Sequence, residues 1–420
     1  MPVSVDAAAG AGYPVGMPRD LPEALPRAKD RPAERVAKMR PFLTMQLAER
    51  AFELQREGAE IAHLGLGEPD FPAPEAAIRA CAEALLERPA RYEESAGLPA
   101  LRRAIAADLE QRFGAKVSAD RVLVTPGTSP AMLLAFSLLL EPGDEVVYAT
   151  PHYPCYPNFI RYCGGVPVPV PTAPENGWKL DPERVARVTG PKTRAIIVGS
   201  PANPTGAVQD RATLERLSEL GVPLVSDEVY DGLVYDGCEA TSALGLGDRH
   251  FVVDGFSKRY AMTGFRLGWL VVPEWAVAPA RIALQNLFIS ANGFVQRAGV
   301  AALASGAESL AAMRADFAKR RLRLVEGLRD LGFEVQRPPD GAFYVFAGAR
   351  RFGGDSLALA RALLERAFVN VAPGCDFGEA GEGYLRFSFA VRETTLETAL
   401  ERMARVLPEL EVAGAAGGSQ

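Results

Sequence analysis

Lys258 has the sequence surroundings of a lysine that does covalent chemistry. It follows a strand-like apolar stretch at residues 251–253 and lies between Ser257 and Arg259. Arg266 comes eight positions later. Burial or nearby positive charge lowers the pKa of a lysine amine, so such a residue can attack an aldehyde and hold a carbonyl cofactor as a Schiff base. For a lysine taken alone, a surface charge is the commoner explanation, so the remaining polar groups must decide.

Two turns elsewhere in the chain offer the hydrogen-bonding groups that such a cofactor needs. Residues 125–129, Thr-Pro-Gly-Thr-Ser, run from a strand into a helix, and the N–H groups at a helix N-terminus suit a phosphate. An ordinary N-cap is the alternative. Asn203 is flanked by Pro201 and Pro204, which fix a rigid turn and aim its amide, although an ordinary turn has the same composition.

Two charged residues lie in apolar, strand-like segments and therefore need partners. Asp227 ends the apolar run at 224–226, so its burial requires a cationic partner or several hydrogen-bond donors. Arg386 lies in the run 384–389, Tyr-Leu-Arg-Phe-Ser-Phe. A guanidinium is costly there unless it meets a carboxylate, which it can bind through two hydrogen bonds.

Together, these residues match the requirements of pyridoxal phosphate. That cofactor needs a lysine for its aldehyde, a carboxylate that keeps its ring nitrogen protonated, donors to its phenolate oxygen and a cup for its phosphate. The carboxylate of its substrate needs a cation as well. Asn203, Asp227, Lys258, Arg266 and Arg386 provide such groups, each in a fitting local context.

The segments around these residues predict an α/β fold with a mainly parallel, seven-stranded sheet sandwiched by helices. Between residues 120 and 275, short β-branched runs alternate with helical patterns. Ligands bind such sheets at loops after the carboxyl ends of the strands. Strands are expected at 122–125, 145–149, 166–170, 194–198, 224–226, 251–253 and 267–272, and a helix at 129–140.

The C-terminal part predicts a smaller α+β domain. Helices are expected at 311–331, 356–367 and around 396–407, and strands at 333–335, 343–346, 369–371 and 384–388. The expected division is a flexible N-terminal extension (1–35), a small domain (36–65 and 300–412), a large cofactor-binding domain (66–299) and a disordered tail (413–420).

Composition argues against several kinds of partner. The 420-residue chain has a net charge of −6 and no basic block, which speaks against nucleic acid. No apolar run reaches the ~18–20 residues that span a membrane, and no secretory signal is visible. The five cysteines are scattered and the histidines number three, which speaks against a metal site and favours a reducing cytoplasm.

The chain resembles the class I/II aminotransferases of the fold-type-I pyridoxal-phosphate-dependent enzymes, from about residue 35 to about residue 410. The motifs that carry the resemblance are 65–71 (GLGEPDF), Tyr92 with 97–102 (GLPALR), 151–154 (PHYP), 203–206 (NPTG), 226–228 (SDE), 257–258 (SK), 266–269 (RLGW) and Arg386. The resemblance implies pyridoxal phosphate as cofactor, amino acid and 2-oxo acid substrates, and a homodimer with shared active sites.

The resemblance also assigns roles toward the cofactor. It implies that Lys258 forms the Schiff base and later moves the proton of the substrate α-carbon, and that Asp227 pairs with the ring nitrogen. Tyr230 and Asn203 would hydrogen-bond the phenolate oxygen, and Tyr153 would stack on the ring. The residues implied for the phosphate are Gly127, Thr128, Ser129, Ser257 and Arg266, with Tyr92 reaching the phosphate of the neighbouring subunit.

On the substrate side, the resemblance implies that Arg386 and Asn203 bind the α-carboxylate and that Gly67 lets its segment close over it. Transfer would be ping-pong between two substrates. The stretches 282–296 and 129–140 contain no Lys or Arg for a second carboxylate, which favours a neutral or apolar amino donor. Arg161 and Arg297 remain possible contributors.

Two other activities stay open at this point. The same residues can serve β-elimination, as in a C–S lyase, or a γ-elimination. A different class is a regulator that uses such a domain as a non-catalytic sensor. Those proteins carry a separate DNA-binding region, and the N-terminal 35 residues are too short and too poor in helical pattern for one.

Overall fold

A computed structural model describes residues 32–87 and 89–417 of the chain, with side chains up to residue 410. The chain divides into two units, Met1–Lys38 and Met39–Gln420. The predicted extension of residues 1–35 lies mostly outside the described residues; the described part of the first unit holds one short helix, α1 (Glu34–Ala37).

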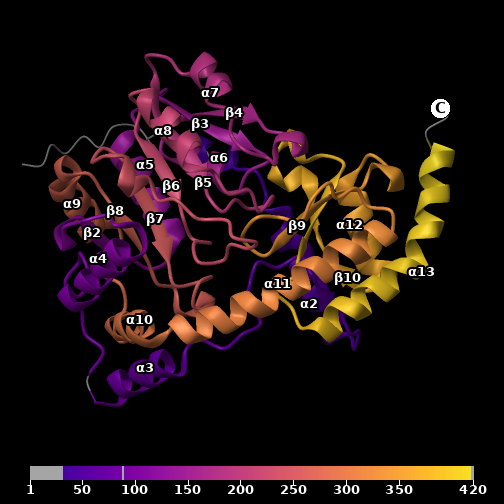
Figure 1. The fold of residues 1–420 in the computed structure, drawn as a ribbon, viewed down its shortest axis with the longest axis horizontal. Helices are drawn as coiled ribbons and strands as arrows, with labels where there is room; N and C mark the ends of the chain where they lie inside the picture. The colour runs from indigo at the N-terminus through magenta and orange to yellow at the C-terminus, as the bar shows by residue number, and fades with distance from the viewer. Residues whose placement is uncertain (1–31, 88, 418–420) are drawn as a thin grey trace, which may run out of the picture. The chain divides into compact units, whose positions relative to one another are not determined.

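A seven-stranded sheet forms the centre of the second unit (Figure 1), as the alternation of strands and helices predicts. Its strands, in spatial order, are β2 (Val122–Thr125), β8 (Gly268–Val271), β7 (Phe251–Gly255), β6 (Leu224–Asp227), β5 (Thr193–Gly199), β3 (Glu145–Thr150) and β4 (Val166–Pro171). Only β8 runs antiparallel to its neighbours, β2 and β7. The prediction of a mainly parallel sheet is therefore confirmed.

Helices pack on both faces of this sheet because successive strand residues point to opposite sides. In β7, Val252 lies in one buried cluster, whereas Phe251 and Val253 lie in another. The helices of the first face are α4 (Pro99–Phe113), α7 (Pro182–Val188), α8 (Arg211–Glu219) and α10 (Gly293–Ser305), with α3 (Glu75–Glu87) packed on α10. Those of the second face are α5 (Thr128–Leu139), α6 (Tyr156–Tyr162) and α9 (Val277–Leu287).

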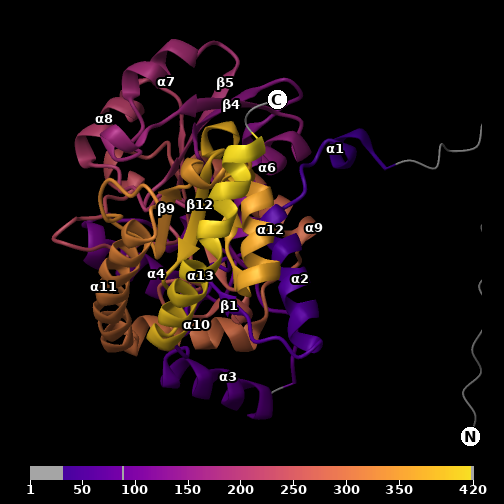
Figure 2. The same ribbon diagram turned by 90° about the vertical axis from the view of Figure 1, so that its right-hand side faces the viewer.

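The C-terminal residues, together with residues 43–63, build two smaller sheets with their own helices. The strands are β9 (Tyr344–Gly348), β11 (Ala372–Pro373) and β12 (Tyr384–Ser388) in one sheet, and β1 (Ala62–His63) with β10 (Val369–Asn370) in the other. The helices are α2 (Leu43–Arg56), α11 (Ala307–Asp330), α12 (Ser356–Ala367) and α13 (Glu393–Gly417). Figure 2 shows α2, α12 and α13 side by side.

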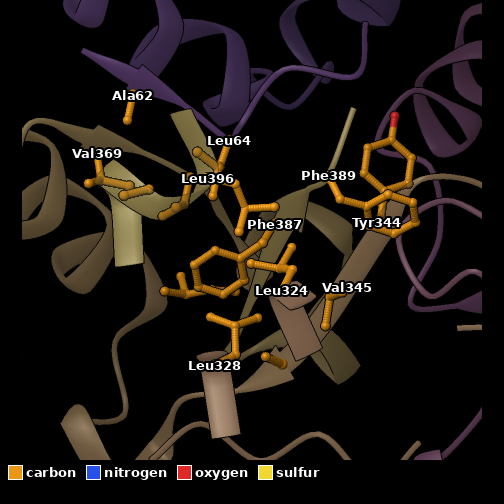
Figure 3. Packing of buried hydrophobic residues seen from close by; sticks show 14 of the residues in the cluster. Ala62, Leu64, Leu324, Leu328, Tyr344, Val345, Val369, Phe387, Phe389 and Leu396 are labelled. Carbon is orange, nitrogen blue, oxygen red and sulfur yellow. The ribbon is translucent and has the colours of Figure 1, made fainter. Parts of the chain in front are cut away.

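One buried cluster joins these elements. Figure 3 shows Phe387 of β12 together with Leu324 and Leu328 of α11 and Leu396 of α13. The same cluster takes residues from α2 and β1, so the segment around residues 43–64 packs with the C-terminal elements although it precedes the large sheet in the chain. The exact boundary between a large and a small domain stays a prediction.

Three details differ from the expected elements. Residues 333–335 form no strand; Glu334 makes a single bridge to Gly348, and the prolines at 338 and 339, which lack N–H groups, follow at once. The short strands β1 and β11 were not expected. Helix α13 runs to Gly417, into the predicted tail, where alanine favours helix. Among the described residues, no helix is long and apolar enough to cross a membrane.

Candidate active site

A cavity of about 240 Å³ lies where the loops after β5, β6 and β7 meet the C-terminal sheet. Nearly all of the predicted site residues line it: Gly67, Thr128, Ser129, Tyr153, Asn203, Asp227, Tyr230, Ser257, Lys258, Arg266 and Arg386. Asp227 is the last residue of β6, and Lys258 follows the end of β7 by three residues. The position agrees with the rule that α/β sheets bind ligands beyond the carboxyl ends of their strands.

Lys258 points its amine into this pocket. Its Nζ atom donates a hydrogen bond of 2.6 Å to the backbone oxygen of Gly67. Burial lowers the pKa of the Lys258 amine to about 8; Glu68 opposes the shift, and the positive charges of Arg386 and Arg266 add to it. A larger fraction of this amine is therefore unprotonated at neutral pH than of an ordinary lysine, which makes it a better nucleophile.

Asp227 is held by a residue that the sequence did not indicate. The hydroxyl of Tyr156 donates to its Oδ2 atom at 2.7 Å, and the backbone N–H of Val229 approaches Oδ1 at 3.4 Å. The prediction that Asp227 requires hydrogen-bond donors is confirmed. Burial raises the pKa of the Asp227 carboxyl, and these donors and Lys258 oppose the shift. A cationic N–H group facing this carboxylate would favour its charged form.

Two tyrosines, Tyr230 and Tyr344, line the pocket and contact each other. The hydroxyl groups of Tyr230 and Tyr344 lie 2.8 Å apart, and both side chains are buried. Figure 3 shows the Tyr344 hydroxyl at the edge of the apolar cluster, pointing away from it. Gly67 lies directly over this hydroxyl, because a Cβ atom on Gly67 would overlap it. Only glycine therefore permits the approach of the segment that accepts the Lys258 hydrogen bond.

Arg386 of β12 reaches the pocket through a rigid set of contacts. It donates to Asn203 Oδ1 at 2.8 Å and to the backbone oxygen of Gly65 at 2.6 Å, and it is 3% exposed. Its guanidinium carbon lies 4.2 Å from the ring centre of Tyr344 and 4.9 Å from that of Phe377. Its Nε atom has no partner among the described residues. The guanidinium is thus fixed in place with N–H groups left for an incoming carboxylate.

The opposite end of the pocket has the groups that suit a phosphate. Thr128 and Ser129 begin helix α5, so the positive end of that helix faces the cavity. Ser257 and Arg266 line the same cavity. Gly127 does not line the cavity itself, but a Cβ atom there would lie 2.6 Å from Arg266 Nη2, so the glycine leaves room for that guanidinium.

The match of the chain to the protein family described as aminotransferase class I and II spans residues 59–403. The chain belongs to this family. An aspartate/prephenate aminotransferase of Thermus thermophilus is 39% identical over 381 residues, which are 89% of this chain and 98% of that protein. A valine–pyruvate aminotransferase of Mycobacterium tuberculosis is 39% identical over 375 residues, 88% of this chain and 96% of that protein.

Solved aminotransferase structures have the same fold. An aspartate aminotransferase from Thermus thermophilus with maleate gives a TM-score of 0.85 at 38% identity, covering 90% of this chain and 99% of that chain. An aminotransferase from Mycobacterium tuberculosis gives a TM-score of 0.86 at 38% identity, covering 90% of this chain and 100% of that chain. The protein is therefore a pyridoxal-phosphate-dependent transaminase of fold type I that acts on amino acid and 2-oxo acid substrates.

The charges in the pocket of this aminotransferase fit its cofactor. The pocket lining holds three cationic side chains, Lys258, Arg266 and Arg386, and one carboxylate, Asp227. The excess of positive charge suits the cofactor phosphate and the substrate carboxylate, and the carboxylate suits a protonated ring nitrogen. Among the described residues, no cluster of His, Cys, Asp and Glu is arranged to hold a metal ion.

Some residues that the sequence suggested for the active site of this aminotransferase lie outside the pocket, and some residues that were not predicted line it. Tyr92 is 82% exposed and lines a different cavity, together with Arg297. Arg161 lines another cavity, separate from both. The residues that line the pocket without having been predicted include Phe42, Thr44, Met45, Tyr156 and Tyr344. No local sequence signal points to Tyr156, because it lies 71 positions from Asp227 in the chain.

Proposed function

We propose that the Nζ atom of Lys258 holds the aldehyde carbon of pyridoxal phosphate and that the surrounding pocket carries out transamination. The observation that carries this proposal is the presence of Lys258, Asp227 and Arg386 around one cavity, with the pKa of the lysine lowered to about 8. Asp227 would face the ring nitrogen and Tyr153 the ring. The phosphate would lie at the start of α5 with Thr128, Ser129, Ser257 and Arg266.

Lys258 would also move the proton of the reaction. When bound, pyridoxal phosphate supplies an electron-withdrawing ring that acidifies the α-hydrogen of an amino acid. The Lys258 amine, displaced by the substrate, is the base in the pocket that can take this proton and return it, with the oxygen of Gly67 fixing its direction. Water would supply the oxygen of the 2-oxo acid that leaves, the cofactor would keep the amino group, and a second 2-oxo acid would receive that group while water is released.

The hydrogen bonds between protein groups set which atoms remain for the cofactor and the substrate. Asn203 accepts from Arg386 through Oδ1, which leaves its Nδ2 group to donate to the cofactor phenolate oxygen. Tyr230 would donate to the same oxygen, while its contact with Tyr344 holds it in place. Arg386 would bind the α-carboxylate with the N–H groups that its protein partners leave free.

The amino donor is proposed to have a neutral or apolar side chain. Each of the three cations in the pocket lining has a role already, so none is left for a side-chain carboxylate. The walls include Phe42, Met45 and Leu66. Arg297 pairs with Glu93 at 3.4 Å and lines another cavity, and Arg161 also lies outside the pocket.

A half-reaction tests this proposal. The loaded enzyme is mixed with single amino acids without a 2-oxo acid, and conversion of the bound cofactor to pyridoxamine phosphate is followed by absorbance. Leucine, methionine or phenylalanine should react at least about tenfold faster than aspartate. Aspartate as the fastest donor would contradict the apolar pocket. Release of pyruvate and ammonia without conversion of the cofactor would indicate an elimination enzyme.

A homodimer is the second part of the proposal. Leu85, Tyr92 and Ile289 are large apolar side chains, 51%, 82% and 49% exposed, and they line one cavity of about 810 Å³. Exposed apolar surface of this kind is typical of an interface, and a second copy placed there would let Tyr92 reach the partner's cofactor phosphate. Sedimentation should give twice the chain mass, and Tyr92→Ala should weaken cofactor binding; a monomer at micromolar concentration would contradict this.

A cytoplasmic location is proposed from the cysteines. All five, Cys81, Cys155, Cys163, Cys238 and Cys375, are free in the structure. Free thiols persist in reducing compartments. Fractionation of the source cells tests the location.

A further inference from the structure

A second polar cavity lies next to the active-site pocket and shares no lining residue with it. Its volume is about 540 Å³, within the range of small-molecule sites. Neighbouring residues divide between the two cavities: Tyr153 lines the active-site pocket and His152 lines the second cavity. The elements around the second cavity are the end of β3, helix α6, the edge strand β4, and the short helices η7 (Gly374–Phe377) and η8 (Glu379–Gly381).

Three buried polar atoms in the residues of this wall have no hydrogen-bond partner among the described residues. They are Thr150 Oγ1, His152 Nδ1 and Arg161 Nη1. Thr150 and His152 are 6% and 8% exposed. Buried polar groups in proteins are almost always hydrogen-bonded to protein or to ordered water, so the described residues leave these three atoms without the partners that such groups normally have.

The unpaired charge at this cavity is positive. Neither Arg161 nor the side chain of Arg40 forms an ion pair within the described part of the chain. Arg40 is anchored at its backbone, because Asn158 of α6 accepts from its N–H and donates to its oxygen, both at 3.1 Å. The Arg40 backbone is thereby held beside α6, the helix that carries Arg161, and both arginines line the cavity.

The lining also holds two carboxylates, Asp376 and Glu379, and neither forms an ion pair with these arginines. Asp376 already accepts from the N–H groups of Leu43 and Thr44 and from the Thr44 hydroxyl, at 3.0, 2.9 and 2.7 Å. Glu379 is exposed to solvent at the rim. Burial, together with the charges of Arg40 and Arg161, lowers the pKa of His152 to about 3, so the ring stays neutral and its Nδ1 atom can donate or accept.

Much of the remaining wall is apolar. It includes Tyr148 and the prolines Pro41, Pro154, Pro157, Pro167, Pro169 and Pro171. Gly378 closes one end, and a Cβ atom there would lie 2.6 Å from Thr150 Oγ1 and 2.7 Å from the ring of His152. A molecule in this cavity would therefore meet apolar surface from the prolines and positive charge from Arg40 and Arg161.

We propose that this cavity binds a small organic anion, whose carboxylate or phosphate group lies between Arg40 and Arg161 and whose apolar body rests on the prolines. Thr150 and His152 would form the neutral polar wall behind this group. The site is separate from the transamination pocket and does not depend on the roles proposed there.

Calorimetric titration of the holoenzyme with benzoate, phenyl phosphate and the uncharged benzamide tests the proposal. At least one anion should bind and benzamide should not; the better anion identifies the acidic group. Arg161→Gln should weaken the anion about tenfold or more, since hydrogen bonds to charged groups contribute on this scale. Arg187→Gln, on the exposed side of α7, removes the same charge and should leave the affinity unchanged. Both variants should melt like the parent protein.

Three results would overturn the proposal. One is the loss of anion binding in Arg386→Gln but not in Arg161→Gln, which places the anion in the active site. The second is equal binding of benzamide, and the third is no binding of either anion at millimolar concentration. A crystal structure of the complex adds a direct view: density for the anion between Arg40 and Arg161 supports the site, and ordered water alone contradicts it.

Discussion

Two clusters of charge meet at the loop that follows β7, and they are built in opposite ways. Lys258 belongs to the active-site pocket, where it joins Arg266 and Arg386 against the single carboxylate of Asp227. The next residue, Arg259, is 6% exposed and belongs to a cluster in which cations and carboxylates neutralise one another.

The second cluster connects helix α4 to strand β7 and to the loops that follow β6 and β7. Asp108 of α4 binds Arg259 through two hydrogen bonds of 2.8 and 2.9 Å. Arg112, one turn further along α4, contacts Asp108 at 2.7 Å, Asp254 at 3.5 Å and Asp231 at short range. Burial raises the pKa of Asp254 well above its ordinary value, so it holds a proton more readily and the excess of negative charge is reduced.

The contrast separates a structural use of buried charge from a functional one. Breaking a buried, matched pair leaves an uncompensated charge and destabilises the fold. Removing a cation from the pocket relieves repulsion between like charges instead, and the cost falls on whatever anion binds there. Substitutions in the matched cluster should therefore lower the free energy of unfolding, whereas substitutions in the pocket should lower activity or ligand affinity.

The largest effect is expected at Lys258. Lys258→Ala should lower turnover by at least about 10⁴-fold, because one residue supplies both the nucleophile and the acid–base group. The free energy of unfolding of the Lys258→Ala variant should differ from that of the parent protein by less than about 1 kcal/mol. Steady-state kinetics and urea unfolding measure the two quantities. Near-normal turnover would remove Lys258 from the mechanism, and a collapse of stability would erase the contrast.

The matched cluster should behave in the reverse way. Arg112→Gln should lower the free energy of unfolding by about 3–5 kcal/mol, because it leaves buried carboxylates unpaired. The kcat/KM per folded molecule should stay within about threefold of the parent value. Arg103→Gln, at an exposed position of the same helix, is the control and should change stability by less than about 0.5 kcal/mol. Unchanged unfolding in Arg112→Gln would show that the cluster is not stabilising.

A smaller effect is expected for Tyr156, which supports the pocket carboxylate. Tyr156→Phe removes one hydrogen bond to Asp227 and should raise the Kd for pyridoxal phosphate about tenfold, the scale of a hydrogen bond to a charged group. Fluorescence titration of the apoenzyme measures this affinity. Tyr384→Phe, in the C-terminal sheet and outside the pocket, should leave it unchanged. Equal Kd values for both variants would mean that Tyr156 does not position Asp227.

The smallest effect concerns pH. The pKa of the Lys258 amine is about 8. At a pH below this value most of the amine is protonated and cannot attack the cofactor aldehyde, whereas at a higher pH most of it is unprotonated and can attack. The rate of cofactor loading by the apoenzyme should therefore rise about fivefold from pH 7 to pH 8 and level off above pH 9. Stopped-flow absorbance follows the reaction. A rate that still climbs about tenfold from pH 8 to pH 9 would indicate an ordinary lysine pKa of about 10.4.

The sequence predicted the large sheet and most of the pocket because both rest on local patterns. Each of Asn203, Asp227 and Lys258 follows a recognisable strand, so the rule for α/β sheets brings them together. Arg386 was found because a guanidinium on an apolar strand needs a partner. The family resemblance then supplied roles that spacing alone does not give.

What the sequence did not indicate depends on contacts between distant segments. Tyr344 meets Tyr230 across 114 positions of the chain, and no local pattern announces that pair. Tyr156 resembles any aromatic residue of a helix until Asp227 is placed beside it. The cluster of Arg112 and Arg259 could not be predicted for the same reason. Charged residues on α4 are typical of a solvent-exposed helix face, and no local pattern shows that Asp108 and Arg112 are buried against other segments.

Chemical trapping of the cofactor tests the central claim most directly. The holoenzyme is reduced with borohydride, digested and analysed by mass spectrometry for the lysine that carries the reduced cofactor. The prediction is a single modified peptide, which contains Ser257, Lys258 and Arg259. Stable modification of another lysine, or cofactor that is released unmodified from folded protein, would contradict the assignment of Lys258 and with it the active site described above.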